Sequence, residues 1–322
     1  MVKERQILIF GAGNMAKEYM KVISLYEYKV VIISNSNTNF DFFKSNYKNI
    51  STYTKSEFEL INQINFSEFS FAINCVSIEN LFETTKIILQ LGIKKILLEK
   101  PGSLLISDLD KLIEIEKSKN AQIYIALNRR FHSSTIFIKN LLKSTKVSSA
   151  SFDFTEWKKG IDLNKYNNQS LNKWLYCNSI HVIDLFFYFF GNYKEINSTV
   201  MGVNKLNWHP SSSIFYGTGI LENDIPFNYK SDWNGPGRWG IEFVTEEKKY
   251  ILSPLEKVKE LGLDDFIIRQ SNIDYKDDEK YKPGLKKMID AFIKNDLAEF
   301  NSLEDQKKLF KTLNKIGGYK EN

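Results

Sequence analysis

A glycine-rich turn directly behind the first apolar run constrains the fold of this chain more than any other feature. The run Gln6–Phe10 (QILIF) leads into GAGNMA at residues 11–16, where an amphipathic stretch begins. In a strand, turn and helix of this kind, the glycines let a pyrophosphate approach the backbone, and the helix N-terminus offers free N–H groups to the phosphates. The pattern predicts dinucleotide binding by Gly11, Gly13, Asn14 and Met15.

The segments that follow repeat the alternation of strand and helix. Strand-like runs stand at residues 29–34, 71–77, 94–99 and 121–127, and helical patterns stand at residues 14–26, 77–92 and 108–120. This alternation predicts a parallel, doubly wound sheet. From about residue 130, several strand-like segments follow without helices between them, which predicts a large, mainly antiparallel sheet.

We therefore expect an α/β fold with two domains. The first is a Rossmann domain at residues 1–127. The second, at residues 128–322, is an α+β domain with an open sheet for substrate binding and oligomerisation, and its C-terminal helix can pack back on the Rossmann domain.

Composition excludes several classes of protein. The net charge of +5 is spread along the 322 residues without a block of like charges, so we expect no nucleic-acid partner. The longest apolar segment, residues 182–190, is too short to span a bilayer, and the N-terminus carries no secretory signal. The two cysteines form neither a disulfide framework nor a metal motif. We expect a cytoplasmic protein without a membrane or metal partner.

The end of the second strand bears on the choice of cofactor. An acid there would hold the ribose hydroxyls of NAD, but the chain has no acid until Asp41. Hydroxyl groups could instead bind a 2′-phosphate, which favours NADP slightly over NAD, although no arginine follows the strand. The alternative is that these residues form only a polar loop. The residues concerned are Ser34, Asn35 and Ser36.

Lys100 stands before Pro101 where the strand-like run at residues 94–99 ends. Ligands of a doubly wound sheet bind at the carboxyl ends of its strands, so Lys100 is expected to project toward the nicotinamide and donate to a reacting oxygen. The alternative is a solvated surface lysine.

Four motifs in this order, GAGNMA, LEKPGS, NRRF and HVIDLF, resemble the Gfo/Idh/MocA oxidoreductases, named for glucose-fructose oxidoreductase and inositol dehydrogenase. The resemblance covers nearly the whole chain, and the tail is similar to the closing helices of sugar-acting members. It implies hydride transfer between NAD(P) and a sugar or nucleotide-sugar carbon, in surface glycan biosynthesis, by a homodimer or homotetramer paired through the open sheet. It also implies that Glu99 and Lys100 contact the cofactor and that Lys100 polarises the reacting oxygen.

The second catalytic stretch of the family has an acid, a histidine four residues later and an aspartate three beyond. Here it reads CNSIHVID, so His181 and Asp184 match while Cys177 replaces the acid. His181 is the expected proton acceptor because its pKa lies near neutrality. Cys177 and Asp184 are possible further catalytic residues, Asp184 more readily as a structural partner. A thiolate and imidazolium pair, and a buried structural histidine, are the alternatives.

Other residues suggest substrate contacts. Asn128, Arg129 and Arg130 precede a helix. The two arginines oppose its dipole, so we expect an anionic partner, which could be the cofactor, the diphosphate of a nucleotide sugar or a nearby carboxylate such as Glu99. Trp233 could stack on a sugar or pack under the sheet. A non-catalytic dinucleotide-binding sensor or assembly protein remains the rival hypothesis, because Cys177 replaces the acid.

Overall fold

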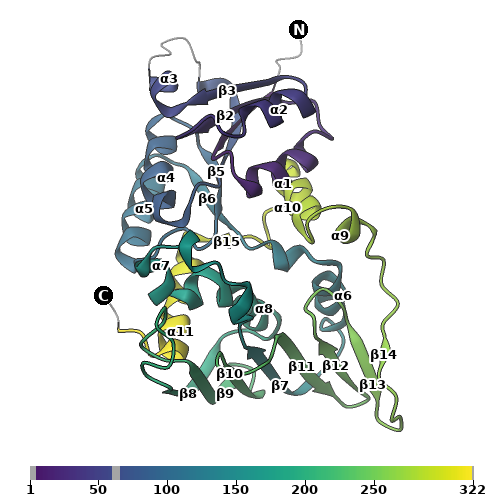
Figure 1. Ribbon diagram of the computed structural model, residues 1–322. Coiled ribbons are helices and arrows are strands. Elements are labelled where there is room, and N and C mark those ends of the chain that lie inside the picture. Colours follow the sequence, from purple (N-terminus) through teal and green to yellow (C-terminus); the bar gives the residue numbers. More distant parts are fainter. Residues whose placement is uncertain (1–4, 60–65, 321–322) are drawn as a thin grey trace. The chain divides into compact units, whose positions relative to one another are not determined.

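The computed structural model describes residues 5–59 and 66–320 (Figure 1). The chain forms two compact units. One contains residues 1–127 with 280–307, and the other contains residues 128–279 with 308–322. The α/β fold expected from the sequence is confirmed, with a parallel sheet in the first unit and a mainly antiparallel sheet in the second.

The sheet of the first unit has the order β15-β6-β5-β4-β1-β2-β3, and all its neighbours are parallel except β15 against β6. The chain proceeds outward from β1 to β3 and then returns to the other side of β1 with β4. The carboxyl ends of β1 and β4 therefore border the switch point where such sheets bind ligands. The strands are β1 (Gln6–Phe10), β2 (Lys29–Ser34), β3 (Ile50–Thr54), β4 (Phe69–Asn74), β5 (Lys95–Glu99), β6 (Gln122–Ala126) and β15 (Asn301–Ser302).

Helices cover the apolar strands of this unit. One of these helices, α10, comes from much later in the chain. Its buried Phe292 packs with its ring centroid 5.2 Å from that of Phe71 on β4 and 6.3 Å from that of Tyr124 on β6. The helices are α1 (Asn14–Ile23), α2 (Phe40–Asn46), α3 (Lys55–Glu59), α4 (Leu81–Gln90), α5 (Ile106–Ser118) and α10 (Leu285–Lys294).

The sheet of the second unit has the order β14-β13-β12-β11-β7-β10-β9-β8, with β7 and β10 as its one parallel pair among the described strands. The strands are β7 (Val147–Phe154), β8 (Tyr193–Met201), β9 (Ile214–Leu221), β10 (Pro226–Asp232), β11 (Trp239–Thr245), β12 (Lys248–Leu252), β13 (Lys259–Gly262) and β14 (Arg269–Gln270). Helices α6 (Ser133–Leu141), α7 (Asn168–Asn172) and α9 (Lys276–Lys280) also form here, and α11 (Leu303–Gly317) belongs partly to each unit.

Buried apolar side chains alternate with more exposed polar ones along the strands, so the two faces of this sheet differ. Aromatic side chains of one face pack against α8 (Ile180–Phe190), and the ring centroids of Phe152 and Phe186 are 4.6 Å apart. The other face carries polar residues such as Ser151 and Glu242, and it is hollowed by about 510 Å³. One face is thus a core surface, while the other is open.

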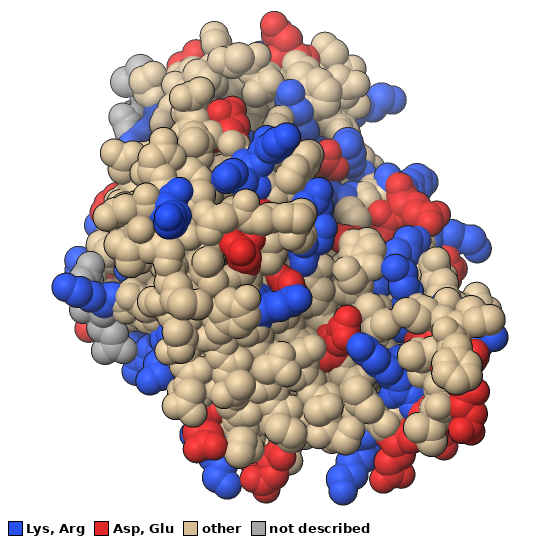
Figure 2. Space-filling view, turned by 60° about the horizontal axis from the view of Figure 1, so that its bottom comes forward, with Lys and Arg blue, Asp and Glu red and all other residues tan. Residues whose placement is uncertain are grey.

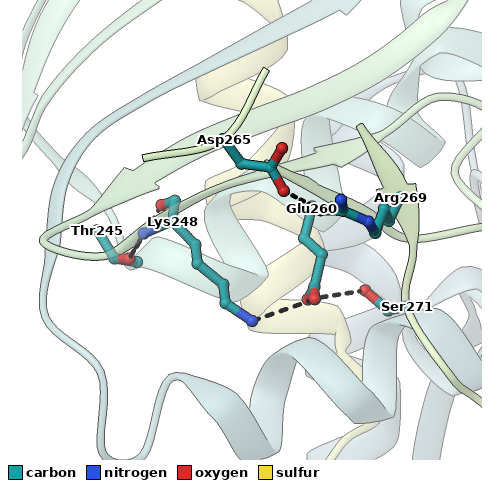
Figure 3. A network of polar contacts seen from close by, with 6 residues as sticks. All are labelled: Thr245, Lys248, Glu260, Asp265, Arg269 and Ser271. Carbon is teal, nitrogen blue, oxygen red and sulfur yellow. Dashed lines mark hydrogen bonds and ion pairs between the residues drawn. The ribbon is translucent and has the colours of Figure 1, made fainter. Parts of the chain in front are cut away.

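The β13–β14 hairpin at one edge of this sheet is held by polar contacts (Figure 3). Lys248 donates to Glu260 at 3.1 Å, Ser271 donates to the same carboxylate at 3.2 Å, and Arg269 pairs with Asp265. These contacts fix the loop between the strands, whose apolar side chains are exposed.

Acidic and basic side chains are interspersed on the face shown in Figure 2. Within residues 5–59 and 66–320, no helix has the length and apolarity needed to cross a membrane.

Candidate functional site

The turn after β1 forms a cradle that a side chain would fill. Gly11 has φ +108°, and a Cβ there would stand 2.7 Å from the carbonyl oxygen of Cys75, so the turn requires glycine. Gly13 caps α1 without a side-chain hydrogen bond, and none of the described atoms lies within 4 Å of a Cβ built on it. The backbone N–H groups at the start of α1 therefore border open space that a pyrophosphate can occupy.

A pocket of about 280 Å³ lies beside this turn, at the carboxyl ends of β1, β2 and β4. Of the predicted cofactor residues, Gly11, Gly13, Ser34 and Asn35 line it. Asn14 and Met15 form the first turn of α1, and the hydroxyl of Ser36 lies 3.1 Å from that of Thr38. The size, the glycine cradle and the hydroxyl and amide groups fit the adenosine half of a dinucleotide.

Lys55 also lines this pocket and was not expected from the sequence. The register of β2 and β3 pairs Ser34 with Thr54, so Lys55 follows at the same sheet edge as Asn35. In the sequence the two residues are far apart, and only the neighbouring positions of β2 and β3 bring them together.

Glu99 ends β5 in the first unit, and Lys100 follows it directly. The hydroxyl of Tyr19 donates to the Glu99 carboxylate at 2.6 Å. Burial raises the pKa of Glu99, and the hydrogen bond from Tyr19 and the charge of Lys100 offset part of that rise. Glu99 is thus fixed inside the unit, and the half-buried Lys100 follows it.

His181 lies in the first turn of α8 in the second unit, and a π-helical turn, Leu175–Ser179, precedes it. Cys177 lies within that turn. Its thiol is buried and donates to the carbonyl oxygen of Ser170 at 3.3 Å. Residues four apart stay close to one face in a π turn as they do in an α-helix, so the π turn does not separate residues 177 and 181.

Glu156, just beyond β7, is the acid beside the turn that precedes His181, and sequence reasoning missed it. The side chain is 4% exposed. Its carboxylate accepts hydrogen bonds from Ser179 Oγ at 2.6 Å and from Asn178 Nδ2 at 2.7 Å. Burial raises the pKa of Glu156 to about 6, and the hydrogen bonds from Ser179 and Asn178 offset part of the rise.

A cavity of about 450 Å³ lies at this carboxylate, within the second unit. The ring of Trp239, which helps to line it, is 6.1 Å from the ring of His181 and 4.9 Å from the guanidinium of Arg129. Burial lowers the pKa of Arg129 to about 10, while Glu256 and Glu156 act to raise it, so the side chain is still a cation at neutral pH. The other lining residues include Trp157, Asn178, Arg238 and Glu256.

The remaining predicted substrate residues have varied surroundings. Arg130 forms a two-pronged ion pair with Asp184, with Nε 2.9 Å from Oδ2 and the second nitrogen 2.6 Å from Oδ1. The carboxylate opposite Arg130 is therefore Asp184. Asn128 is buried at the start of the short helical segment Asn128–Phe131. Trp233 is fully buried, and its indole N–H donates to the carbonyl oxygen of Phe154. Trp239, and not Trp233, lines the cavity.

Neither a protein-family model nor a curated protein matches the sequence. Solved structures resemble the whole chain. UDP-N-acetylglucosamine 3-dehydrogenase GnnA from Acidithiobacillus ferrooxidans is similar with a TM-score of 0.74 at 10% identity, over 100% of this chain and 99% of that chain. The dehydrogenase MviM from Clostridium difficile is similar with a TM-score of 0.76 at 18% identity, over 98% of this chain and 99% of that chain.

An oxidoreductase from Agrobacterium radiobacter, in complex with NAD+, L-tartaric acid and magnesium, gives a TM-score of 0.75 at 12% identity, over 98% of this chain and 96% of that chain. The likeness to these structures extends through both units, and it confirms the fold that the sequence motifs indicated.

Proposed function

We propose that this chain, which has the fold of the Gfo/Idh/MocA dehydrogenases, is an NAD(P)-dependent oxidoreductase that transfers a hydride to or from a sugar or nucleotide-sugar carbon. The observation that carries the proposal is the pocket over the Gly11–Gly13 turn, which has the lining that a dinucleotide needs. The resemblance of the motifs and the name of GnnA, a UDP-N-acetylglucosamine 3-dehydrogenase, support a sugar or nucleotide-sugar substrate. The resemblance of the motifs alone supports a role in surface glycan biosynthesis.

The lining of the cofactor pocket supports a slight preference for NADP over NAD. Ser34 and Asn35 bring no negative charge to the end of β2, and Lys55 adds a positive charge beside them. A 2′-phosphate would gain hydrogen bonds and a cation at this edge, whereas the end of β2 offers the ribose hydroxyls of NAD no carboxylate. The acid that also lines the pocket, Glu83, lies on α4 and is paired with Lys86.

The proposed chemistry uses Lys100 and His181. Lys100 donates a hydrogen bond to the reacting oxygen and stabilises its developing negative charge. His181 accepts the proton of the substrate hydroxyl in oxidation and returns it in reduction. A bound nicotinamide would supply the carbon that accepts or releases the hydride. Aromatic rings of the cavity beside His181, those of Trp157 and Trp239, offer faces for a sugar ring.

Cofactor binding is tested with Gly13→Leu in a fluorescence titration of NADPH and NADH. Open space around Gly13 lets the variant fold, so a loss of affinity reports the blocked pyrophosphate position. Gly235→Leu, at another uncrowded glycine in the second unit, is the matched control and should keep its affinity. Unchanged binding by the Gly13 variant would show that the cofactor does not bind over this turn.

Catalysis is tested with Lys100→Met, which keeps the length of the side chain and deletes the donor. We expect kcat to fall by a factor of about 10² to 10⁴ while the affinity for NADPH is preserved. UDP-N-acetylglucosamine leads the panel of sugars and nucleotide sugars. If the wild type binds the cofactor but turns over none of the panel, the non-catalytic sensor becomes the better account.

A further inference from the structure

The helix that carries His181 has no acid at position 177, where the family pattern has one. Cys177 does not fill that role in this structure, because its buried thiol donates to the carbonyl oxygen of Ser170. The carboxylate of Asp184, on the same helix, is engaged by Arg130, so a carboxylate without an ion pair has to come from another element.

Glu156 approaches the turn before His181 from the end of β7. Its carboxylate holds Ser179 and Asn178, which are two and three residues ahead of the histidine. The same carboxylate lines the 450 Å³ cavity, and Trp239, whose ring faces His181 at 6.1 Å, lines that cavity too. Glu156 thus contacts the turn and, although buried, also lines the cavity.

The bonding of Glu156 also differs from that of a purely structural ion-paired acid. The partners that the described residues give its carboxylate are neutral donors: a hydroxyl and an amide hydrogen-bond to it, and the indole N–H groups of Trp174 and Trp239 also act to lower its pKa. Arg129 acts on it through charge, and no ion pair between the two is among the contacts of the described residues. A substrate hydroxyl can therefore approach a carboxylate that no arginine or lysine has neutralised by direct contact.

We propose that Glu156 takes the place of the missing helix acid: it binds a hydroxyl group of the substrate in the cavity and stabilises the protonated form of His181. The proposal deepens the proposed function and rests on it for the identity of the substrate class. The proton that His181 holds is the one released by the substrate hydroxyl, so the role of Glu156 requires no further reactant.

Several charged or titratable groups share this environment. They are Arg129 before α6, Glu256 after β12, Tyr319 after α11 and His181 on α8. The positive charge of Arg129 acts to lower the pKa of a nearby histidine, whereas the negative charges of Glu156 and Glu256 act to raise it. The net effect of removing only the Glu156 charge is therefore a lower pKa of His181.

The test is a pH titration of the imidazole carbon resonances in protein labelled with ¹³C-histidine, without any ligand. The chain has three histidines, so His181→Asn assigns the resonance. We expect Glu156→Gln to lower the pKa of His181 by roughly 0.5 to 1 unit. Glu156→Asp, which keeps the charge, should restore most of the wild-type value. Glu222→Gln, at an exposed acid just after β9, is the matched control and should leave the pKa of His181 unchanged.

If the Glu156→Gln protein does not fold, the Glu156→Asp variant and the wild type still decide the matter. The wild-type His181 resonance should then show a second inflection near pH 6, where Glu156 titrates, and the aspartate variant should move that inflection. An unmoved His181 pKa in folded Glu156→Gln, or a wild-type curve without the inflection, would overturn the proposal. The measurement needs no cofactor or substrate. A result that contradicts the role of Glu156 would therefore leave the proposed oxidoreductase activity unaffected, and a lack of turnover would leave the measured effect of Glu156 on His181 unaffected.

Discussion

Lys55 is the one basic side chain among the described residues that line the cofactor pocket. It is exposed, so its interaction with a phosphate is screened by salt and is weaker than that of a buried cation. It still lies at the sheet edge where β2 and β3 end together, next to Asn35. Lys55 therefore offers a way to separate recognition of the 2′-phosphate from binding of the rest of the dinucleotide.

We predict that Lys55→Met weakens NADPH binding by about 10-fold at low ionic strength, which corresponds to one charge-assisted hydrogen bond. NADH, which lacks the phosphate, should bind as before. Fluorescence titrations of both cofactors measure the two affinities, and Lys48→Met, at an exposed lysine of the same unit, is the control. An equal loss for NADH and NADPH would show that Lys55 does not contact the 2′-phosphate, and a wild-type preference for NADH would contradict the lean toward NADP.

Local sequence suffices to find residues whose role depends on chain neighbours. Gly11 and Gly13 were predicted from the strand and helix around them, and the structure shows a tight turn that requires glycine at residue 11 and open space beside residue 13. Glu156 and Lys55 could not be predicted in this way. Each comes close to its site only because the sheet brings two distant strands together, and an isolated glutamate or lysine carries no local signal.

At the scale of elements, the ion pair between Arg130 and Asp184 joins the short helical segment Asn128–Phe131 to α8. The two side chains are 13% and 4% exposed, and both oxygens of the carboxylate are engaged. The pair therefore holds α8, and with it His181, against the segment that carries Arg129. Removal of one partner would leave the other charge in a desolvated position.

Asp184→Asn should accordingly lower the free energy of unfolding by about 3 to 5 kcal/mol, as measured by urea denaturation. Asp224→Asn makes the same chemical change in the exposed pair with Lys194, whose partners are 66% and 78% exposed. Because an exposed pair contributes little, that control should lose less than about 1 kcal/mol. Equal losses in the two variants would mean that the Arg130–Asp184 pair does not fasten α8.

Hydrophobic periodicity predicted most of the regular elements of the first unit, because each pattern reports which side chains are buried. It did not predict β3 (Ile50–Thr54) or α2 (Phe40–Asn46), whose apolar patterns are short. The π turn at Leu175–Ser179 was not predicted either, because residues four apart lie close to one face in a π turn as in an α-helix, so the spacing of the side chains does not distinguish the two.

At the scale of the molecule, the second unit has an open sheet face and an apolar hairpin loop at the edge of the same sheet. Leu263, Phe266, Ile267 and Ile268 are 78%, 100%, 61% and 51% exposed. The polar contacts of Asp265, Arg269, Lys248 and Glu260 order the loop that presents them (Figure 3). Clustered apolar side chains on an ordered loop are typical of a protein interface.

We propose that two copies pair through this sheet and that the hairpin loop packs on the partner copy, since burial of one large apolar side chain contributes about 1.5 to 3 kcal/mol. Light scattering after size exclusion should then give a multiple of 37.6 kDa for the wild type. The double variant Phe266→Ser and Ile268→Ser should shift the population toward the mass of one chain.

Leu25→Ser, at an exposed apolar residue just after α1, controls for the general loss of surface hydrophobicity and should keep the wild-type mass. A monomeric wild type at tens of micromolar would contradict pairing altogether. A double variant that stays assembled would instead exclude the hairpin loop and leave the sheet face as the surface to be tested. Val244→Lys is the variant for that second test, because Val244 is 37% exposed and lines the hollow of the open face, where a lysine on each copy would place like charges against each other.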